Sequence, residues 1–443
     1  MRYYGRRGYV LLMALLCTCT VNSFAETQPK FTLVPQTPTS LTLFKGEEGL
    51  VTYLVTNQTN ITRTLTMTPI EDVAQVTLGA DVCANPFTLQ SHQSCLLKLK
   101  ITGGATVNVA TPELCKTMSA TNNSPDHLLC SRSSPENALQ VSVESSRAYL
   151  TNSAANTVTM CSLNTSTAGD FLTDCQNAGA SDLSTPAGIA LSKIDGAVYL
   201  YIINSATASI TACKIDRHRG FVTSCFPPFR SSALSDIQDV AVSAGNDYLY
   251  VNNASPTNNI VRCSLNLTGD EIGGLDSCYT PESDASFNSP QGIALDNTGT
   301  HVYVANNLGN SITRCGLIGF GDTTECVATS LASISSTMQP SAVALNSAGN
   351  ILYVADSFSN YLVQCAVSAV EGLLSDCQGT SSGYLNQPSG LGVNYADTQL
   401  LVANAPTGIP VAQFGIPSSS LDQATFLSQS NVASGNYGIA LLE

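Results

Sequence analysis

The chain has 443 residues, of which 43% are hydrophobic and only 11% are charged, and its formal net charge is −14 at pH 7. An acidic chain repels nucleic acids and anionic membranes, so we expect neither as a partner. Beyond the first 25 residues no stretch reaches the ~18 uninterrupted apolar residues that a membrane helix needs. The length favours two domains.

Residues 1–25 have the features of a cleaved secretory signal. Three arginines within the first seven residues precede a short apolar stretch, and Ser23 and Ala25 supply the small residues that signal peptidase needs. The alternative is a lipid anchor at Cys17 or Cys19, which the larger residues before them disfavour. Cleavage would leave 15 basic against 32 acidic residues, a net charge of −17. We therefore expect a secreted or periplasmic protein.

Residues 26–103 are predicted to form a small immunoglobulin-like β-sandwich, because short runs of alternating apolar residues are separated by turn residues. The chain has no tryptophan and lacks the long cysteine spacing of antibody domains, so the term describes architecture only. Residues 104–146 are rich in Thr, Ser, Asn and Pro. We interpret them as a connector that is stapled by Cys115 and Cys130 and leads into the next domain.

A repeat of about 50 residues, the length of a propeller blade, fills residues 147–443. Each unit has a first run of the Gly-Ile-Ala-Leu type, a second of the Tyr-Val-Ala-Asn type, and two further runs that mostly carry one cysteine each. First runs lie at 188–191, 239–242, 292–295, 342–345, 390–393 and 438–441; second runs lie at 149–152, 201–204, 250–253, 303–306, 353–356 and 401–404. The short runs, bounded by turn residues, predict four strands per unit and an all-β fold with six propeller blades.

The order of the runs at the two ends of the repeat region predicts how the ring closes. The region opens with a second run at 149–152 and ends with an isolated first run at 438–441. If these two runs pair, no sheet edge stays open. An open stack of repeats would instead need capping units at both ends. The sequence thus predicts a six-bladed β-propeller closed by its C-terminal strand.

The repeat resembles the NHL and YVTN-type β-propeller families. The resemblance rests on segments such as Pro-Gln-Gly-Ile-Ala-Leu-Asp at 290–296, followed by Val-Tyr-Val-Ala-Asn at 302–306, and it covers residues 148–442. It implies the propeller architecture. It says little about function, because such propellers serve as binding platforms, as scaffolds and occasionally as hydrolases or lyases.

The fourteen cysteines beyond residue 25 form seven close pairs. These pairs are Cys83 with Cys95, Cys115 with Cys130, Cys161 with Cys175, Cys213 with Cys225, Cys263 with Cys278, Cys315 with Cys326, and Cys365 with Cys377. In an exported protein we expect disulfides between nearest neighbours, and without Cys-x-x-Cys motifs we do not expect zinc. In five blades the pair would join the third and fourth strands, worth roughly 3 kcal/mol for each disulfide. In the sixth blade Phe414 and Phe426 stand near the two cysteine positions.

Two classes of function compete. A binding or scaffold module needs no catalytic residues, whereas a metal-assisted hydrolase would place carboxylates, Asn and His around the channel, where calcium can polarise a substrate. The four histidines all lie outside the first runs, and the chain has no Gly-x-Ser-x-Gly elbow, phosphate loop or dense calcium loop. We expect a monomeric binding protein, not an enzyme, that engages a protein or glycan. A calcium-dependent, lactonase-like hydrolase or a lyase is the alternative.

One residue of the Asn or Asp type ends every second run. The six residues are Asn152, Asn204, Asn253, Asn306, Asp356 and Asn404. On one rim of the ring they would suit a sugar or a hydrated cation, but each could instead cap its own turn. The best candidates for calcium ligands are Asp239, Asp296 and Asp356. No other cofactor is expected.

Overall fold

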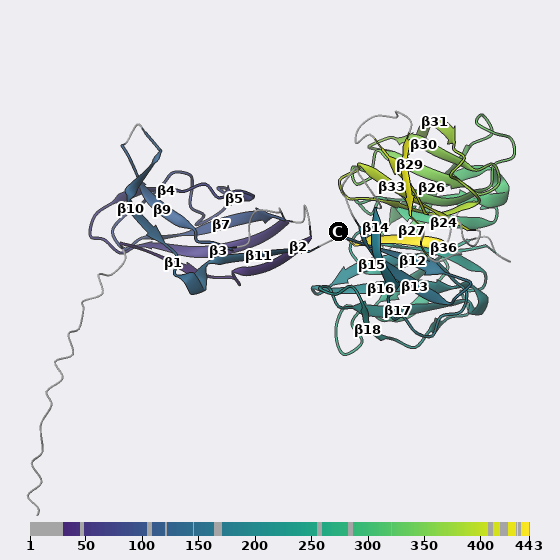
Figure 1. Cartoon of the computed structure of the whole chain (residues 1–443), viewed down its shortest axis with the longest axis horizontal. Coiled ribbons are helices and arrows are strands. Elements are labelled where there is room, and N and C mark those ends of the chain that lie inside the picture. Colours follow the sequence, from purple (N-terminus) through teal and green to yellow (C-terminus); the bar gives the residue numbers. More distant parts are fainter. Residues whose placement is uncertain are drawn as a thin grey trace, which may run out of the picture. The chain divides into compact units, whose positions relative to one another are not determined.

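The computed structural model is almost entirely β-structure (Figure 1). It describes residues 30–44, 48–103, 109–119, 122–144, 146–163, 171–254, 259–281, 287–319, 321–405, 411–416, 424–430, 432 and 436–442. The segment predicted as a signal, 1–25, lies outside them. The only described helices are the single 3-10 turns η1 (Pro135–Asn137), η2 (Ser205–Thr207) and η3 (Asn307–Gly309). No described helix is both long and apolar enough to cross a membrane.

The described chain folds into two compact units. Unit 1 takes in the described residues up to Thr39 together with Leu50–Lys100 and Val109–Leu139, and unit 2 takes in Ser40–Gly49, Ile101–Asn108 and Gln140–Glu443. Unit 1 contains two four-stranded sheets. The first has the order β1 (Phe31–Pro35), β3 (Glu48–Asn57), β7 (Ser94–Thr102), β5 (Val73–Val76), and the second β10 (Pro125–Arg132), β9 (Glu113–Thr117), β4 (Arg63–Met67), β6 (Phe87–Leu89). Buried apolar side chains such as Val55, Leu65 and Leu99 form its core.

The predicted boundary at 103/104 is not where the sheets divide. Strand β9 pairs with β4 and β10, so two strands of the expected connector belong to a sheet that also contains strands of the preceding segment. The reason is burial: Leu114 and Cys115 of β9 are fully buried, and only pairing removes their backbone from water. The end of the segment, β11 (Leu139–Glu144), pairs in parallel with β2 (Ser40–Phe44) in a sheet that also contains β8 (Val109–Ala110).

Unit 2 contains six further sheets. In each of them, four strands lie side by side and neighbouring strands run antiparallel. The first sheet contains β12 (Arg147–Asn152), β13 (Thr157–Leu163), β14 (Leu172–Asn177) and β36 (Asn436–Leu442), and the second contains β15 (Pro186–Ile194), β16 (Ala197–Asn204), β17 (Ser209–Ile215) and β18 (Val222–Cys225), with β19 (Phe229–Arg230) beside β17. The third contains β20 (Ile237–Val242), β21 (Tyr248–Asn253), β22 (Asn259–Leu265) and β23 (Leu275–Tyr279), and the fourth contains β24 (Pro290–Leu295), β25 (His301–Asn306), β26 (Ser311–Ile318) and β27 (Asp322–Ser330). The fifth contains β28 (Pro340–Leu345), β29 (Ile351–Asp356), β30 (Tyr361–Val367) and β31 (Leu374–Ser381), and the sixth contains β32 (Pro388–Val393), β33 (Gln399–Asn404), β34 (Val411–Gly415) and β35 (Thr425–Ser430).

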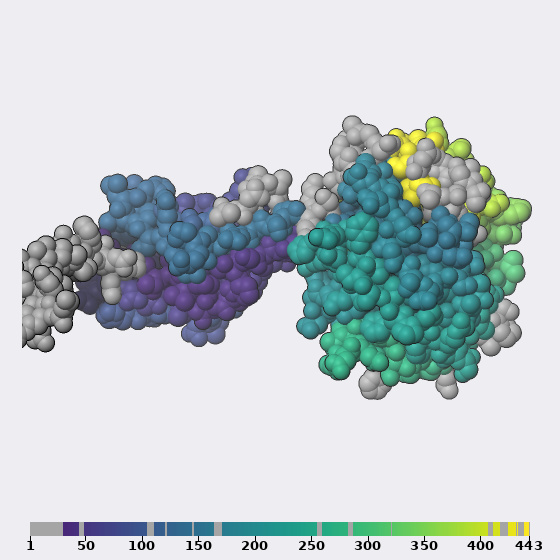
Figure 2. Space-filling model, turned by 60° about the horizontal axis from the view of Figure 1, so that its bottom comes forward, coloured from purple at the N-terminus to yellow at the C-terminus, as the bar shows by residue number. Residues whose placement is uncertain are grey.

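The chain's last described strand belongs to the sheet that opens the repeat region. β36 pairs antiparallel with β12, and Leu441 lies opposite Ala148, as the sequence predicts. We call the strands that contain the first and second runs of the repeat the first and second strands of their sheets. The first strands lie beside one another in a cyclic order: β36, β15, β20, β24, β28, β32 and again β36. In Figure 2 the yellow C-terminal residues pack beside the blue-teal residues with which this part of the chain begins. This arrangement of radial sheets is that of a β-propeller.

Small residues let the first strands approach each other closely. A Cβ atom built on Gly292 would lie 2.6 Å from the Cα of Ala342 in the next sheet, and one on Gly438 would lie 2.7 Å from the carbonyl oxygen of Ala187. Real Cβ atoms do not come this close to backbone, because packed interiors leave no room for it. The glycine of the first run is therefore required by the packing of neighbouring sheets.

In four of the six sheets, the tyrosine of the second run joins the sheet to the next one. Its side chain is buried, and its hydroxyl donates a hydrogen bond to the carbonyl oxygen of a glycine in the outer turn of the following sheet. The pairs are Tyr149 with Gly220 (2.8 Å), Tyr201 with Gly273 (2.9 Å), Tyr250 with Gly321 (3.0 Å) and Tyr303 with Gly372 (2.9 Å). Each glycine has a positive φ, a conformation that strains other residues. The repeat thus carries its own contact between sheets.

All seven predicted disulfides are present. Two lie in unit 1, and five join the third and fourth strands of sheets in unit 2, where Cys213, for example, lies directly opposite Cys225. The bonded pairs are Cys83 with Cys95, Cys115 with Cys130, Cys161 with Cys175, Cys213 with Cys225, Cys263 with Cys278, Cys315 with Cys326, and Cys365 with Cys377. Disulfides in this number are typical of proteins from an oxidising compartment.

The last sheet of unit 2 has an aromatic pair in place of the disulfide. Phe414 of β34 lies opposite Phe426 of β35, and their ring centroids are 5.8 Å apart. The sequence predicts this substitution, because the two phenylalanines stand near the positions of the missing cysteines. An edge-to-face contact of two rings thus links the same two strands without a covalent bond.

The close approach at Gly292 makes a stability prediction. Gly292→Ala forces the backbones of two neighbouring first strands apart, and overpacking of this kind costs about 1–3 kcal/mol of unfolding free energy. Gly383→Ala is the matched control, because nothing lies within 4 Å of the position that its Cβ would take. Chemical denaturation would measure both variants. Equal stability of the two would contradict the role assigned to Gly292.

Candidate functional site

A polar pocket of about 340 Å³ lies where the first strands begin and the second strands end. Its described lining comes from several sheets of unit 2. The lining residues are Ala187, Gly188, Gln238, Asp239, Gln291, Gln339, Ser341, Ser357, Phe358, Gln387, Ser389 and Ala405. A smaller cavity of about 90 Å³, lined further along the first strands, shares Asp239 and Ser389 with this pocket. The size of the larger pocket and its mixed lining fit a small-molecule site.

Asp239 occupies a position that holds only a small residue in the other sheets. In every sheet, the first residue of the first strand lies opposite the last residue of the second strand. This shared register allows the six first strands to be aligned residue by residue. Two residues further on, the other five sheets have Gly188, Gly292, Ala342, Gly390 and Gly438. The carboxylate therefore stands where the ring is most crowded, and the glycine at 188 makes room for it: a Cβ there would collide with Asp239.

The carboxyl group of Asp239 is held by two backbone N–H groups. Its Oδ2 accepts a hydrogen bond from Ile293 (3.1 Å), and its Oδ1 accepts one from Val240 (2.9 Å). Burial outweighs these bonds and raises the pKa of Asp239 to about 7. The side chain still borders the pocket. A carboxyl group that titrates near neutral pH can both take up and release a proton during a reaction.

Asn252 positions this carboxylate. Its Oδ1 accepts hydrogen bonds from the backbone N–H groups of Gln238 (3.2 Å) and Asp239 (2.8 Å), both in a stretch where the β20–β21 register shifts. Such bulges often re-aim a side chain beside an active site. Asn252 is fully buried, and its Nδ2 has no hydrogen-bond partner among the described residues. The corresponding residues of the other sheets are Thr151, Ile203, Ala305, Ala355 and Ala403.

Four glutamines line the pocket, and the sequence analysis missed all of them. Gln238 and Gln291 follow the first residue of a first strand, whereas Gln339 and Gln387 come just before one. The Oε1 of Gln291 accepts a hydrogen bond from Asn307 (3.1 Å), which leaves its Nε2 without a partner among the described residues. Scattered glutamines carry no recognisable motif. Only alignment of the six first strands would have drawn attention to them.

The six Asn and Asp residues that end the second strands are buried and hold their own loops. Asn204, for example, accepts a hydrogen bond from the N–H of Ser184 (2.9 Å), and Asn404 accepts one from the N–H of Asn386 (2.9 Å). Similar bonds engage the others: Asn152 with Ala155, Asn253 with Ser235 and Asp236, Asn306 with Asn288, and Asp356 with Gln339 and Ser359. None lines the pocket. These bonds match the alternative that each side chain caps a turn.

The three aspartates proposed as calcium ligands do not come together. Asp239 borders the pocket, whereas Asp356 bonds its own loops and Asp296 follows the opposite end of β24. A strand of six residues spans ~20 Å, so Asp296 is far from the pocket. It accepts hydrogen bonds from Thr300 and contacts His301 Nδ1 (2.9 Å). Of the three aspartates, only Asp239 belongs to the described lining of the pocket.

The disulfide-bonded cysteines are structural and lie outside the site. No cysteine lines the pocket. The second members of five pairs, Cys95, Cys175, Cys278, Cys326 and Cys377, are each bonded to the partner that the sequence predicts. A sulfur atom in a disulfide is neither a nucleophile nor a metal ligand, because both roles need the thiolate. The cysteines therefore contribute no chemistry to the pocket.

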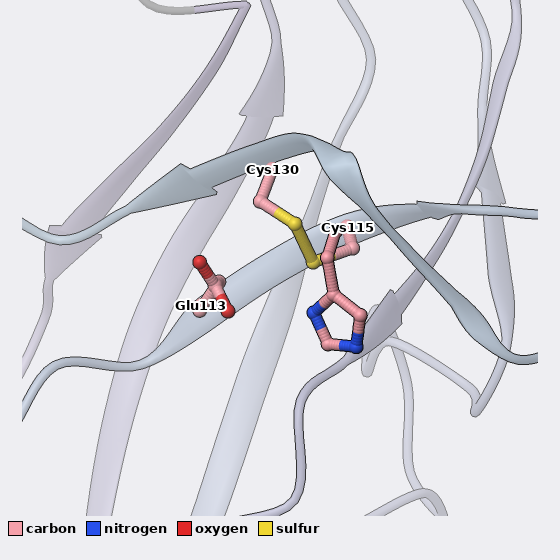
Figure 3. Close-up of side chains that lie close together, drawn as sticks. Glu113, Cys115 and Cys130 are labelled. Carbon is pink, nitrogen blue, oxygen red and sulfur yellow. A yellow bond between two sulfur atoms is a disulfide. The ribbon is translucent and has the colours of Figure 1, made fainter.

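A second cluster with metal-ligating side chains lies in unit 1. Glu113, Cys115, His127 and Cys130 place one ligand atom each within 4.8 Å of the others (Figure 3). The two sulfur atoms are joined in a disulfide, so neither is available as a thiolate. Arg132 donates to Glu113 (2.7 Å), and this contact lowers the pKa of that carboxyl group. The cluster is accounted for by the disulfide and the ion pair.

Comparison with known proteins supports the β-propeller. The model of a family described as "Lactonase, 7-bladed beta-propeller" matches residues 285–416, less than a third of the chain. The described strands of unit 2 form six sheets, one fewer than that description gives. No curated protein sequence matches.

Several solved structures contain chains that are similar to this chain at low sequence identity. A putative 6-phosphogluconolactonase from Bacteroides fragilis is 14% identical, with a TM-score of 0.48 and coverage of 68% of this chain and 98% of that one. The periplasmic gluconolactonase PpgL of Pseudomonas aeruginosa is 13% identical, with a TM-score of 0.49 and coverage of 68% and 99%. A chain of a nidogen–laminin complex is 11% identical, with a TM-score of 0.49 and coverage of 67% and 98%.

These findings correct one expectation. The prediction that the protein is not an enzyme is wrong, because the match to the lactonase family model points to a hydrolytic enzyme. The sequence has no histidine in a first run and no known nucleophile motif, and it marks Asp239 only as a candidate calcium ligand. The group that borders the pocket is a single aspartate in a first strand, which no such motif marks.

The raised pKa of Asp239 makes stability depend on pH. Between about pH 4 and pH 7 the folded protein holds a proton that the unfolded chain has released, so the unfolding free energy falls as the pH rises. The interval between 3.8 and about 7 corresponds to about 4 kcal/mol at most. Asp239→Asn should therefore raise the melting temperature at pH 8 and leave it nearly unchanged at pH 4. An equal effect at both pH values would contradict the assignment.

Proposed function

We propose that this protein is a hydrolase that opens a lactone in the pocket beside Asp239. The observation that carries the proposal is a carboxyl group with a pKa near neutrality that borders the pocket, at a position where all other sheets have glycine or alanine. The match of residues 285–416 to a lactonase family model supports it independently. Residues with such shifted pKa values cluster at functional sites.

The proposed chemistry requires one general base. The Asp239 carboxylate takes a proton from a water molecule, whose oxygen attacks the lactone carbonyl carbon. The bond from that carbon to the ring oxygen then breaks, and protonated Asp239 returns the proton to the leaving oxygen. The products are a carboxylic acid and an alcohol in one open chain, so no atom or electron is left over. Asp239 ends each cycle as it began.

Gln291 is suited to stabilise the charge that develops on the carbonyl oxygen. Asn307 holds its Oε1, so the amide group presents Nε2–H donors that have no other partner among the described residues. A fixed donor aimed at a developing oxyanion typically contributes 10²–10³-fold in rate. Asn252 contributes indirectly, because it fixes the backbone from which Asp239 projects.

Three finer features complete the proposal. The cyclic contacts of the first strands and the pairing of β36 with β12 support a closed six-bladed propeller for residues 147–442. The two four-stranded sheets of unit 1 support an immunoglobulin-like sandwich, which starts after the proposed signal 1–25 and includes β9 and β10 of the segment first taken as a connector. Seven disulfides support export to the periplasm or the exterior.

Loss of Asp239 should abolish turnover. In a screen of lactones, Asp239→Asn should lower kcat at least 100-fold, in line with the usual contribution of a general base. The wild-type rate should rise with pH through about 7, because the base acts only when it is deprotonated. Asp182→Asn, at an exposed position outside the pocket, is the control. Undiminished kcat in Asp239→Asn would refute the proposal.

The separation of the three aspartates predicts that calcium is not required. Treatment with EDTA should leave both kcat and the melting temperature unchanged, because the three candidate carboxylates do not converge and only Asp239 lines the pocket. Differential scanning fluorimetry and a lactone assay would measure the two quantities. A loss of activity that added calcium restores would show that a calcium site exists and that our assignment of the carboxylates is wrong.

A further inference from the structure

We infer that the pocket takes an uncharged ring that bears several hydroxyl groups and discriminates against phosphorylated or carboxylated versions of the same ring. This inference rests on the proposed function, because it names the substrate class of the same site. Two observations carry it: the charge around the pocket, and the chemistry of its lining side chains. Each leads to the same ligand by a separate argument.

No basic side chain is placed to receive an anion. The described lining contains no Lys or Arg, and its one ionisable group is Asp239. Residues 147–443 carry eight basic against 22 acidic residues, and none of the basic ones lies beyond Arg314. The stretches of this range that the structure does not describe contain no Lys or Arg in their sequence. The described lining therefore offers a phosphate or carboxylate group no side chain of opposite charge.

Three arginines of unit 2 are engaged elsewhere. The guanidinium carbon of Arg262 lies 4.2 Å from the ring centroid of Tyr248 and 4.1 Å from that of Tyr279. Arg314 donates to the carbonyl oxygen of Glu325 (3.1 Å), and Arg230 donates to that of Thr207 (2.7 Å). The three arginines lie on third and outer strands, and none of them is among the described lining residues.

The polar lining suits hydroxyl groups. A carboxamide both donates and accepts hydrogen bonds, and so does a hydroxyl group, whereas a phosphate dianion only accepts. The side chains of Gln339 and Gln387 have no hydrogen-bond partner among the described residues. Gln238 uses its Nε2 to bond Asp236 (2.7 Å) and so presents an acceptor, while Gln291 presents a donor. The lining therefore offers both donors and acceptors, as several hydroxyl groups on one ring require.

One large apolar side chain completes the lining. The Phe358 side chain lines the pocket, yet 61% of the residue is exposed to solvent. An exposed aromatic ring loses its contact with water when it packs against the C–H face of a bound ring. Leu308 occupies the corresponding turn of the preceding sheet, is 66% exposed and does not line the pocket. It therefore offers a matched control.

The test measures binding without turnover. The δ-lactam of gluconic acid is an uncharged, hydroxylated and hydrolysis-resistant ring, and its 6-phosphate adds a charged group to the same ring. Isothermal titration of the wild-type protein should give a Kd at least tenfold lower for the uncharged lactam, with little dependence on salt. Gln387→Lys should improve binding of the phosphate at least tenfold, whereas Tyr395→Lys, exposed and outside the lining, should not. Phe358→Ala should weaken binding of the uncharged lactam several-fold, and Leu308→Ala should not.

The outcomes separate this inference from the proposed function. Equal or tighter binding of the phosphorylated lactam, or no binding of either lactam at millimolar concentration, would overturn the inference. If the uncharged lactam binds selectively but no lactone is hydrolysed, the hydrolase proposal fails and the ligand class stands. If phosphorylated lactones are hydrolysed faster than uncharged ones, the hydrolase proposal stands and the ligand class is wrong.

Discussion

The close approach of neighbouring first strands determines how the sheets of unit 2 pack against each other. Backbone meets backbone at Gly292 and Ala342, and again at Gly438 and Ala187, with no space for a side chain between them. In a ring of sheets built on such contacts, neighbouring first strands are close-packed against each other, and any larger residue between them must be accommodated by its neighbours. The pairing of β36 with β12 places the chain's last strand in the same set of contacts.

The outer parts of the sheets are held together by different means. Buried tyrosine hydroxyls bond glycine carbonyls in the next sheet, which satisfies polar groups that would otherwise be buried without partners. Disulfides then join the third and fourth strands, where side chains are more exposed and contribute less apolar burial. Stability thus comes from packing at the centre, from hydrogen bonds between sheets, and from covalent links at the periphery.

Asp239 is the exception to this construction, and the proposed function depends on it. A carboxylate in the crowded ring destabilises the folded state above neutral pH, as its raised pKa implies. The neighbouring Gly188 leaves space for it, and Asn252 supports the backbone beneath it. Unfavourable burial of this kind persists where the surrounding structure over-determines it, commonly at active sites. The same burial that costs stability gives the carboxyl group a pKa suited to proton transfer.

The amino-acid sequence by itself determined the strand content, the disulfide pairs and the partner of the last strand, because these follow from local periodicity, from cysteine spacing and from the incomplete units at both ends. It also singled out Asp239, but grouped it with Asp296 and Asp356, which lie elsewhere. Only the tertiary structure decided that β9 completes a sheet of unit 1 and that Asp239 meets four glutamines in one pocket. The physical reason is that these side chains come from separate sheets, so their proximity depends on how the sheets pack around a common centre, which no local pattern encodes.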